Sequence, residues 1–126
     1  MRPASRLVVF ALAAAAGTCG GSGGSSPSPV ENPNQMIISA AGVLTPSELV
    51  VSPGSRVLFI NNHTRSHYMA SDPHPDHMDC PELDPVGVLA PGQRRETGNL
   101  NRIRTCGIHD HDDFQNQALW GRIVIR

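Results

Sequence analysis

A cysteine and two histidines lie within six consecutive residues near the end of the chain, in the segment 106–111, "CGIHDH". Thiolate and imidazole are the ligands that copper and zinc take in proteins. All six histidines of the 126-residue chain fall between His63 and His111, although an even spread would scatter them along its whole length. The segment therefore predicts a transition-metal site in this part of the chain.

Two stretches upstream supply further candidate ligands. "FINNHTRSHYMA" ends a predicted strand and carries His67, and the segment 71–87, "SDPHPDHMDCPELDPVG", carries His74, His77 and Cys80. A thiolate together with two imidazoles is the donor set of a trigonal His₂Cys copper site. A Cys-x-x-His on a tight loop would let both side chains point at one ion, while a third ligand arrives from a neighbouring strand.

Short strands separated by Pro-Gly turns must position these ligands. The segments "MIISAAGVL", "SELVVSPGSRVLFINN", "VGVLAPGQRRETGNL" and "LWGRIVIR" are rich in β-branched residues, and turn residues interrupt the two longer ones. No window has helical periodicity. The pattern predicts an all-β, antiparallel sandwich over residues 36–126.

The segment 71–87 contains four prolines, which exclude a central strand or a regular helix. It is therefore predicted to be a long loop. Long loops in compact domains are usually functional or disordered, and the histidines and the cysteine favour function. The roles of His74 and His77 stay open at this point.

Residues 1–19 are predicted to be an export signal. Two arginines precede an apolar run of about ten residues, which is too short to span a bilayer as a helix. Cys19 follows in a setting that resembles a bacterial lipoprotein signal, and ordinary cleavage with soluble release is the alternative. Residues 20–35 are rich in Gly, Ser and Pro and predict a flexible linker. We expect an exported protein of the periplasm or cell envelope, which meets the membrane only through an anchor at Cys19.

Four segments together resemble the cupredoxins, the plastocyanin- and azurin-like blue-copper proteins, over about residues 36–126. They are "LTPSELVVSPGSRVLFINNHTRSH", "LAPGQRRETGNL", "TCGIH" and "ALWGRIVIR". The resemblance implies a Greek-key β-sandwich holding one copper ion that cycles between Cu(I) and Cu(II). It also implies that His67, Cys106 and His109 are the equatorial ligands, with His111 as a second candidate for the role of His109. Leu119 stands where the family has its axial methionine, and this change should raise the reduction potential.

The cysteine count opens a second arrangement. If Cys19 is lipidated or cleaved off, Cys80 and Cys106 remain, and two cysteines in an oxidising compartment normally pair. A disulfide would remove the thiolate and leave only imidazoles to bind copper or zinc. The sequence leaves both arrangements open.

The sequence thus predicts an exported copper-binding protein that works as a one-electron carrier and is not an enzyme. The alternative is a non-redox copper-binding or storage module with a Cys80–Cys106 disulfide and a histidine-only site. A formal net charge of −1 gives no argument for a nucleic-acid partner. We expect a monomer, and a carrier would need a redox partner protein that the sequence does not identify.

Overall fold

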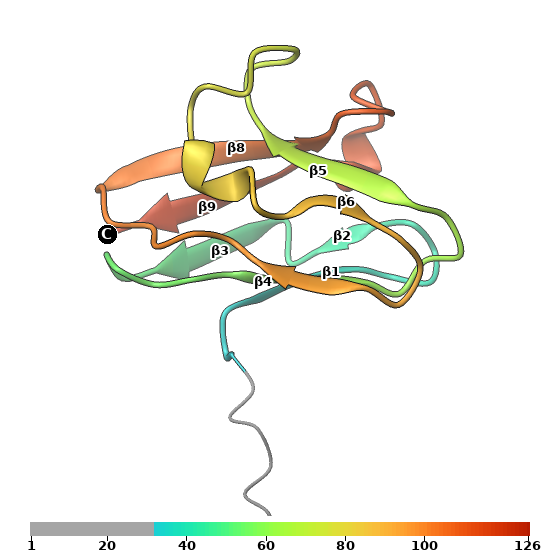
Figure 1. The fold of residues 1–126 in the computed structure, drawn as a ribbon, viewed down its shortest axis with the longest axis horizontal. Coiled ribbons are helices and arrows are strands. Elements are labelled where there is room, and N and C mark those ends of the chain that lie inside the picture. Colours follow the sequence, from blue (N-terminus) through green and yellow to red (C-terminus); the bar gives the residue numbers. More distant parts are fainter. Residues whose placement is uncertain (1–31) are drawn as a thin grey trace, which may run out of the picture.

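Two facing β-sheets make up the domain in the computed structural model, which describes residues 32–126 (Figure 1). The first sheet has the spatial order β2 (Leu44–Thr45), β1 (Gln35–Ile38), β4 (Leu58–Asn61) and β7 (Arg94–Glu96). The second has the order β3 (Glu48–Val51), β9 (Gly121–Ile125), β8 (Arg104–Asp110), β5 (His67–Ser71) and β6 (Gly87–Leu89). Two single-turn 3₁₀ helices, η1 (Pro81–Leu83) and η2 (Gln117–Leu119), lie in the connections. The predicted export signal with Cys19, and residues 20–31 of the predicted linker, lie outside the described residues.

The predicted all-β sandwich is confirmed, but its sheets are mixed rather than wholly antiparallel. Strands β1 and β4 pair in parallel, as do β3 and β9. The chain leaves the first sheet after β2, forms β3 in the second sheet and returns to the first sheet in β4. Because of this crossing, β4 runs in the same direction as β1 instead of turning back on it.

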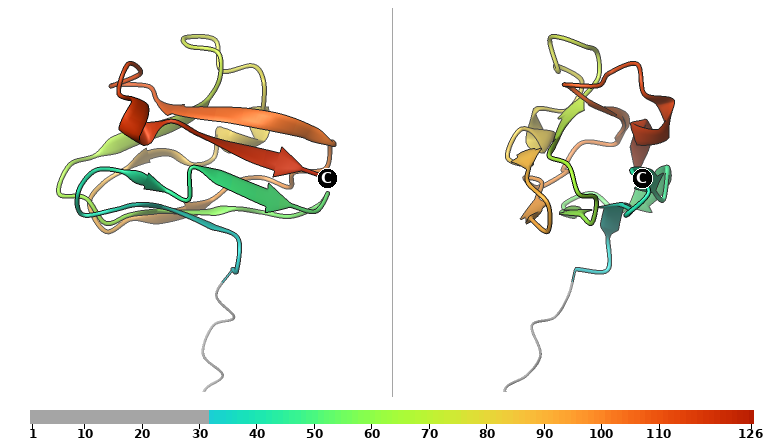
Figure 2. Two further views of the ribbon diagram at one scale, coloured as in Figure 1. Left: turned by 180° about the vertical axis from the view of Figure 1, so that it is seen from behind. Right: turned by 90° about the vertical axis from the view of Figure 1, so that its right-hand side faces the viewer.

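The core fills the space between the two sheets (Figure 2). The first sheet contributes Phe59 and Met36, and the second contributes Met69, Ile108 and Ile123, all of them fully or almost fully buried. Burial of such side chains is the main stabilising term of a small domain. Within residues 32–126, neither helix approaches the length needed to cross a membrane.

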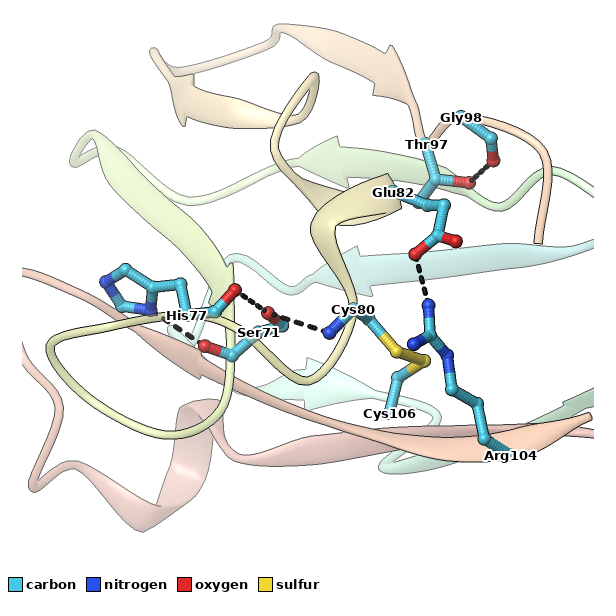
Figure 3. The surroundings of a disulfide bond; sticks show 8 residues. All are labelled: Ser71, His77, Cys80, Glu82, Thr97, Gly98, Arg104 and Cys106. Carbon is cyan, nitrogen blue, oxygen red and sulfur yellow. Dashed lines mark hydrogen bonds and ion pairs between the residues drawn. A yellow bond between two sulfur atoms is a disulfide. The ribbon is translucent and has the colours of Figure 1, made fainter. Parts of the chain in front are cut away.

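A disulfide between Cys80 and Cys106 ties the long loop to β8 (Figure 3). Both cysteines are fully buried and belong to the core. Next to the disulfide, Arg104 forms an ion pair with Glu82 of η1, and the Gly98 amide donates to the Glu82 carbonyl. Together, the disulfide, the ion pair and the hydrogen bond hold the long loop against the sandwich.

We expect the change of both Cys80 and Cys106 to alanine to lower the free energy of unfolding by about 3.5 kcal/mol, the chain-entropy value for a closed loop of this length. The two residues are 26 positions apart. Urea unfolding followed by circular dichroism measures the difference. As a control, thiol titration of the unfolded, unreduced Cys19→Ser protein should find no reactive thiol, and two reactive thiols would contradict the disulfide.

Candidate metal centre

Four histidines converge on the outer face of the second sheet. One ring nitrogen from each of them lies within 4.8 Å of the other three, and their residues are His74, His77, His109 and His111. The first two lie in the loop that follows β5, and the other two lie at the end of β8. Figure 1 shows this loop rising from the edge of the sandwich on the same side as the connection that follows β8. The cluster therefore joins two parts of the chain that are about thirty residues apart.

The alternation of side chains along β8 explains why His109 and His111 share a face. Successive side chains of a strand point to opposite faces, so residues two apart point the same way. Cys106 and Ile108 point into the core, which leaves His109 on the outer face. The His111 amide donates to the Tyr68 carbonyl at 2.7 Å and so extends the pairing with β5 by one residue. His111 thereby joins His109 above the sheet.

Ser71, the last residue of β5, fixes the loop that carries His77 (Figure 3). His77 Nδ1 donates to the Ser71 carbonyl at 2.7 Å, and Ser71 Oγ donates to the His77 carbonyl at 2.8 Å. The Cys80 amide donates to Ser71 Oγ at 3.3 Å. The backbone of His77 lies in the left-handed region, at φ 53°, which a residue with a side chain seldom adopts unless its contacts hold it there. These bonds leave His77 Nε2 as the nitrogen that faces the cluster.

The nitrogens inside the cluster have few partners other than one another. His109 Nε2 and His74 Nδ1 are buried and have no hydrogen-bond partner. His77 Nε2 lies 2.7 Å from His111 Nδ1, within hydrogen-bond distance. Buried polar atoms are almost always paired, so unpartnered nitrogens beside a cluster of imidazoles are the arrangement expected of a metal site. A cation at the centre would give each of the four imidazoles a partner.

The spacing of the four nitrogens suits one transition-metal ion. A metal–imidazole bond is about 2 Å long, so nitrogens on opposite sides of one ion are about 4 Å apart. The four nitrogens, which lie within 4.8 Å of one another, need only small side-chain rotations to reach this spacing. Imidazoles alone suit zinc, copper and nickel, and copper(II) binds most tightly in this series. The residues present thus fit a copper ion held by nitrogen donors, without a thiolate.

His74 completes the cluster from its solvent side. Its ring stacks on that of Phe114, with centroids 4.1 Å apart and an interplanar angle of 8°. Desolvation, followed by repulsion from His111, His109 and His77, lowers the pKa of His74 below its usual value. A lowered pKa keeps the imidazole neutral, which is the form that binds a metal. A pocket of about 370 Å³, lined in part by His74, His109, Phe114 and Trp120, lies beside the site.

Cys106 does not join this cluster, which corrects the thiolate ligand expected for it. Its sulfur is bonded to that of Cys80, with the two Cα atoms 5.8 Å apart. The expectation treated Cys-x-x-His as a tight loop, whereas residues 104–110 form one continuous strand. Residues three apart in a strand point to opposite faces, so Cys106 and His109 cannot coordinate the same ion.

His67 also lies apart from the cluster, because it points inward from β5 and is only 4% exposed. Its Nδ1 donates to Asp110 Oδ2 at 2.7 Å, and its Nε2 lies 2.8 Å from His63 Nδ1. Both ring nitrogens therefore have partners within the protein. Of the four predicted ligands, the structure brings together His109 and His111 and leaves His67 and Cys106 elsewhere.

The remaining members of the cluster, His74 and His77, were left open by the sequence because proline-flanked histidines in a loop can simply be solvated. Asp72 accepts a hydrogen bond from His109 Nδ1, and nothing in its sequence position predicts this contact. The sequence signals for the observed site are the clustering of the histidines, the proline-rich loop that carries two of them, and the spacing of His109 and His111, which share a face only if the strand continues. Leu119, at the position of the expected axial methionine, is buried in the core.

Solved structures of copper proteins share this architecture. A purple cupredoxin from Nitrosopumilus maritimus matches with a TM-score of 0.56 and 17% identity, over 73% of this chain and 98% of its own. Plastocyanin from Dryopteris crassirhizoma matches with a TM-score of 0.54 and 16% identity, over 73% and 99%. Amicyanin from Paracoccus versutus matches with a TM-score of 0.56 and 12% identity, over 79% and 86%. No protein-family model and no curated protein sequence matches the chain. At these identities the likeness concerns the fold, and residues 32–126 form a cupredoxin-like domain.

Proposed function

We propose that this domain binds one copper ion through His74, His77, His109 and His111 and serves as an exported copper-binding module that carries or stores the metal. The observation that carries the proposal is the convergence of four imidazoles, two of which have a buried ring nitrogen without a hydrogen-bond partner among the described residues, His109 Nε2 and His74 Nδ1. Binding and release of the ion require no turnover of a substrate.

The choice of copper rests on the donor set and on the fold. Four neutral imidazoles favour copper(II) over the other divalent first-row ions. The matching solved structures include a Cu(I) form of an amicyanin variant, so this architecture can carry copper in another protein. Export is supported by the Cys80–Cys106 disulfide, since such bonds persist in oxidising compartments. The predicted signal at residues 1–19 agrees with the same location.

One-electron transfer is the second candidate function. Oxidised plastocyanin and the Cu(I) form of an amicyanin variant are among the structures that share the fold, which favours a redox role. A copper ion held by imidazoles can also change its oxidation state. Reversible voltammetry of the copper-loaded protein separates the two functions, because a carrier keeps its ion and geometry through repeated cycles whereas a storage module loses or transfers the ion.

The change His109→Ala should weaken Cu(II) binding by more than about 100-fold, beyond the range expected for the loss of a residue that only supports a ligand. The change His63→Ala is the matched control, because it removes an imidazole that lies outside the cluster and should leave the affinity within about threefold. Titration calorimetry against a competing chelator measures both. Equal affinities for the two variants would contradict the four-histidine site.

The Cu(II)-loaded protein should show only weak visible absorption and no intense thiolate-to-copper band. Cys80 and Cys106, the two cysteines within residues 32–126, are joined in a disulfide, so this domain offers no thiolate to give such a band. Visible absorption together with electron paramagnetic resonance tests this point, and nitrogen hyperfine splitting should report imidazole ligands. An intense visible band in unreduced protein would restore the blue-copper interpretation.

A further inference from the structure

We propose that Asp72 is a positioning residue, which holds His109 so that its Nε2 atom faces the copper ion and which favours Cu(II) over Cu(I). Gly107 is part of the same device because only a residue without a side chain leaves room for the Asp72 carboxylate. The inference rests on the proposed four-histidine site and adds to it the residues that set the orientation and charge of one ligand.

The contact between Asp72 and His109 decides which ring nitrogen is free. His109 Nδ1 donates to Asp72 Oδ1 at 2.6 Å. An ionised carboxylate can only accept hydrogen bonds, so the ring proton lies on Nδ1 and the lone pair lies on Nε2. The same Nε2 is buried and has no hydrogen-bond partner within residues 32–126. Asp72 therefore presents the lone pair of His109 to the centre of the cluster.

Gly107 lies beneath the Asp72 side chain on the outer face of β8. The Asp72 amide donates to the Gly107 carbonyl at 3.0 Å, which brings the start of the loop across the strand. A Cβ atom at Gly107 would lie 2.8 Å from Asp72 Cγ and would overlap Oδ2. Any other residue at position 107 must therefore push the carboxylate away from His109. Position 107 therefore favours glycine because a side chain there would clash with Asp72, and not because of its backbone conformation.

A carboxylate behind a ligating imidazole acts on the metal in two ways. It fixes the ring orientation and tautomer, and it raises the basicity of the nitrogen that binds the ion. Its negative charge also stabilises a doubly charged ion more than a singly charged one. Because the Asp72 side chain is 47% exposed, solvent weakens this charge effect, and the orientation of His109 should dominate the loss of affinity.

The test compares Asp72→Ala with Asp76→Ala in the full chain, using Cu(II) and Cu(I) ions buffered by competing chelators. Asp76 is exposed and lies in the same loop, so its variant removes the same charge without touching His109. We expect Asp72→Ala to lose about 10- to 100-fold in Cu(II) affinity and distinctly less in Cu(I) affinity, with a raised reduction potential. Asp72→Asn keeps an acceptor for Nδ1 and should fall between. Identical affinities and potentials for the Asp72→Ala and Asp76→Ala variants would overturn the inference.

A double-mutant cycle tests the role of Gly107. Gly107→Ala alone should lose as much Cu(II) affinity as Asp72→Ala, because it displaces the carboxylate. In an Asp72→Ala background the same change should cost much less Cu(II) affinity, because the carboxylate is already absent and the remaining contact, with the Cβ of residue 72 at 3.2 Å, requires a shift of only a few tenths of an ångström. Additive losses would contradict the steric coupling. If Gly107→Ala fails to fold, ¹⁵N chemical shifts of the His109 ring in the metal-free Asp72→Ala variant give the tautomer directly, and an unchanged Nδ1–H form would contradict the role of Asp72.

The outcome separates this inference from the function on which it rests. If His109→Ala loses copper but Asp72→Ala binds as the wild type does, only the positioning role fails. If neither variant changes the affinity, the four-histidine site itself is wrong, and the ¹⁵N measurement still reports whether Asp72 sets the tautomer of His109.

Discussion

The period-two geometry of β8 is the constraint on which the rest of the structure depends. This strand runs from Arg104 to Asp110 without a break, so its side chains alternate between the core and the outer face. The side chain of Cys106 therefore points into the core, and that of His109 points to the outer face. The strand thus supplies one cysteine of the buried disulfide to one side of the sheet and the imidazole of His109 to the other, and His111 follows directly after it. A single extra residue in this strand would exchange the two faces.

The disulfide and the histidine cluster lie on opposite faces of the sheet, and both involve the same loop. Cys80 fastens the loop to β8 on the inner side, three residues after His77, while Ser71 ties the His77 backbone to β5. Ordering a loop costs conformational entropy, and the disulfide and these hydrogen bonds offset that cost without a bound ion. The histidines of the loop are therefore held close to those of β8 in the metal-free protein, which reduces the free-energy cost of binding.

The sequence predicts the sandwich and the loop well but not the site. Pro-Gly turns and β-branched runs mark the strands, and four prolines mark segment 71–87, because these signals are local. Whether "CGIH" is a tight loop or a continuing strand depends on its pairing with β5 and β9, which is a tertiary property. Glycine and the polar residues near His109 weaken the alternating pattern, so the sequence does not predict a strand at this position. The pairing of Cys80 with Cys106 has the same origin, since composition makes it plausible but only the fold brings the two together.

The inner face of the same two strands shows why an ion would choose the outer one. His67 and Asp110 meet there, and the Asp110 carboxylate also accepts the amides of Tyr68 and Asp112, at 3.1 and 3.0 Å. These three donors satisfy the buried carboxylate. Loss of any one donor would leave part of its charge without a hydrogen bond in the apolar core. An ion at His67 would have to break the bond to Asp110 or to His63, whereas an ion on the outer face meets two nitrogens with no partner to lose. Strands β5 and β8 thus place histidines on opposite faces of the sheet, and among the described residues the ring nitrogens without a hydrogen-bond partner belong to the outer cluster.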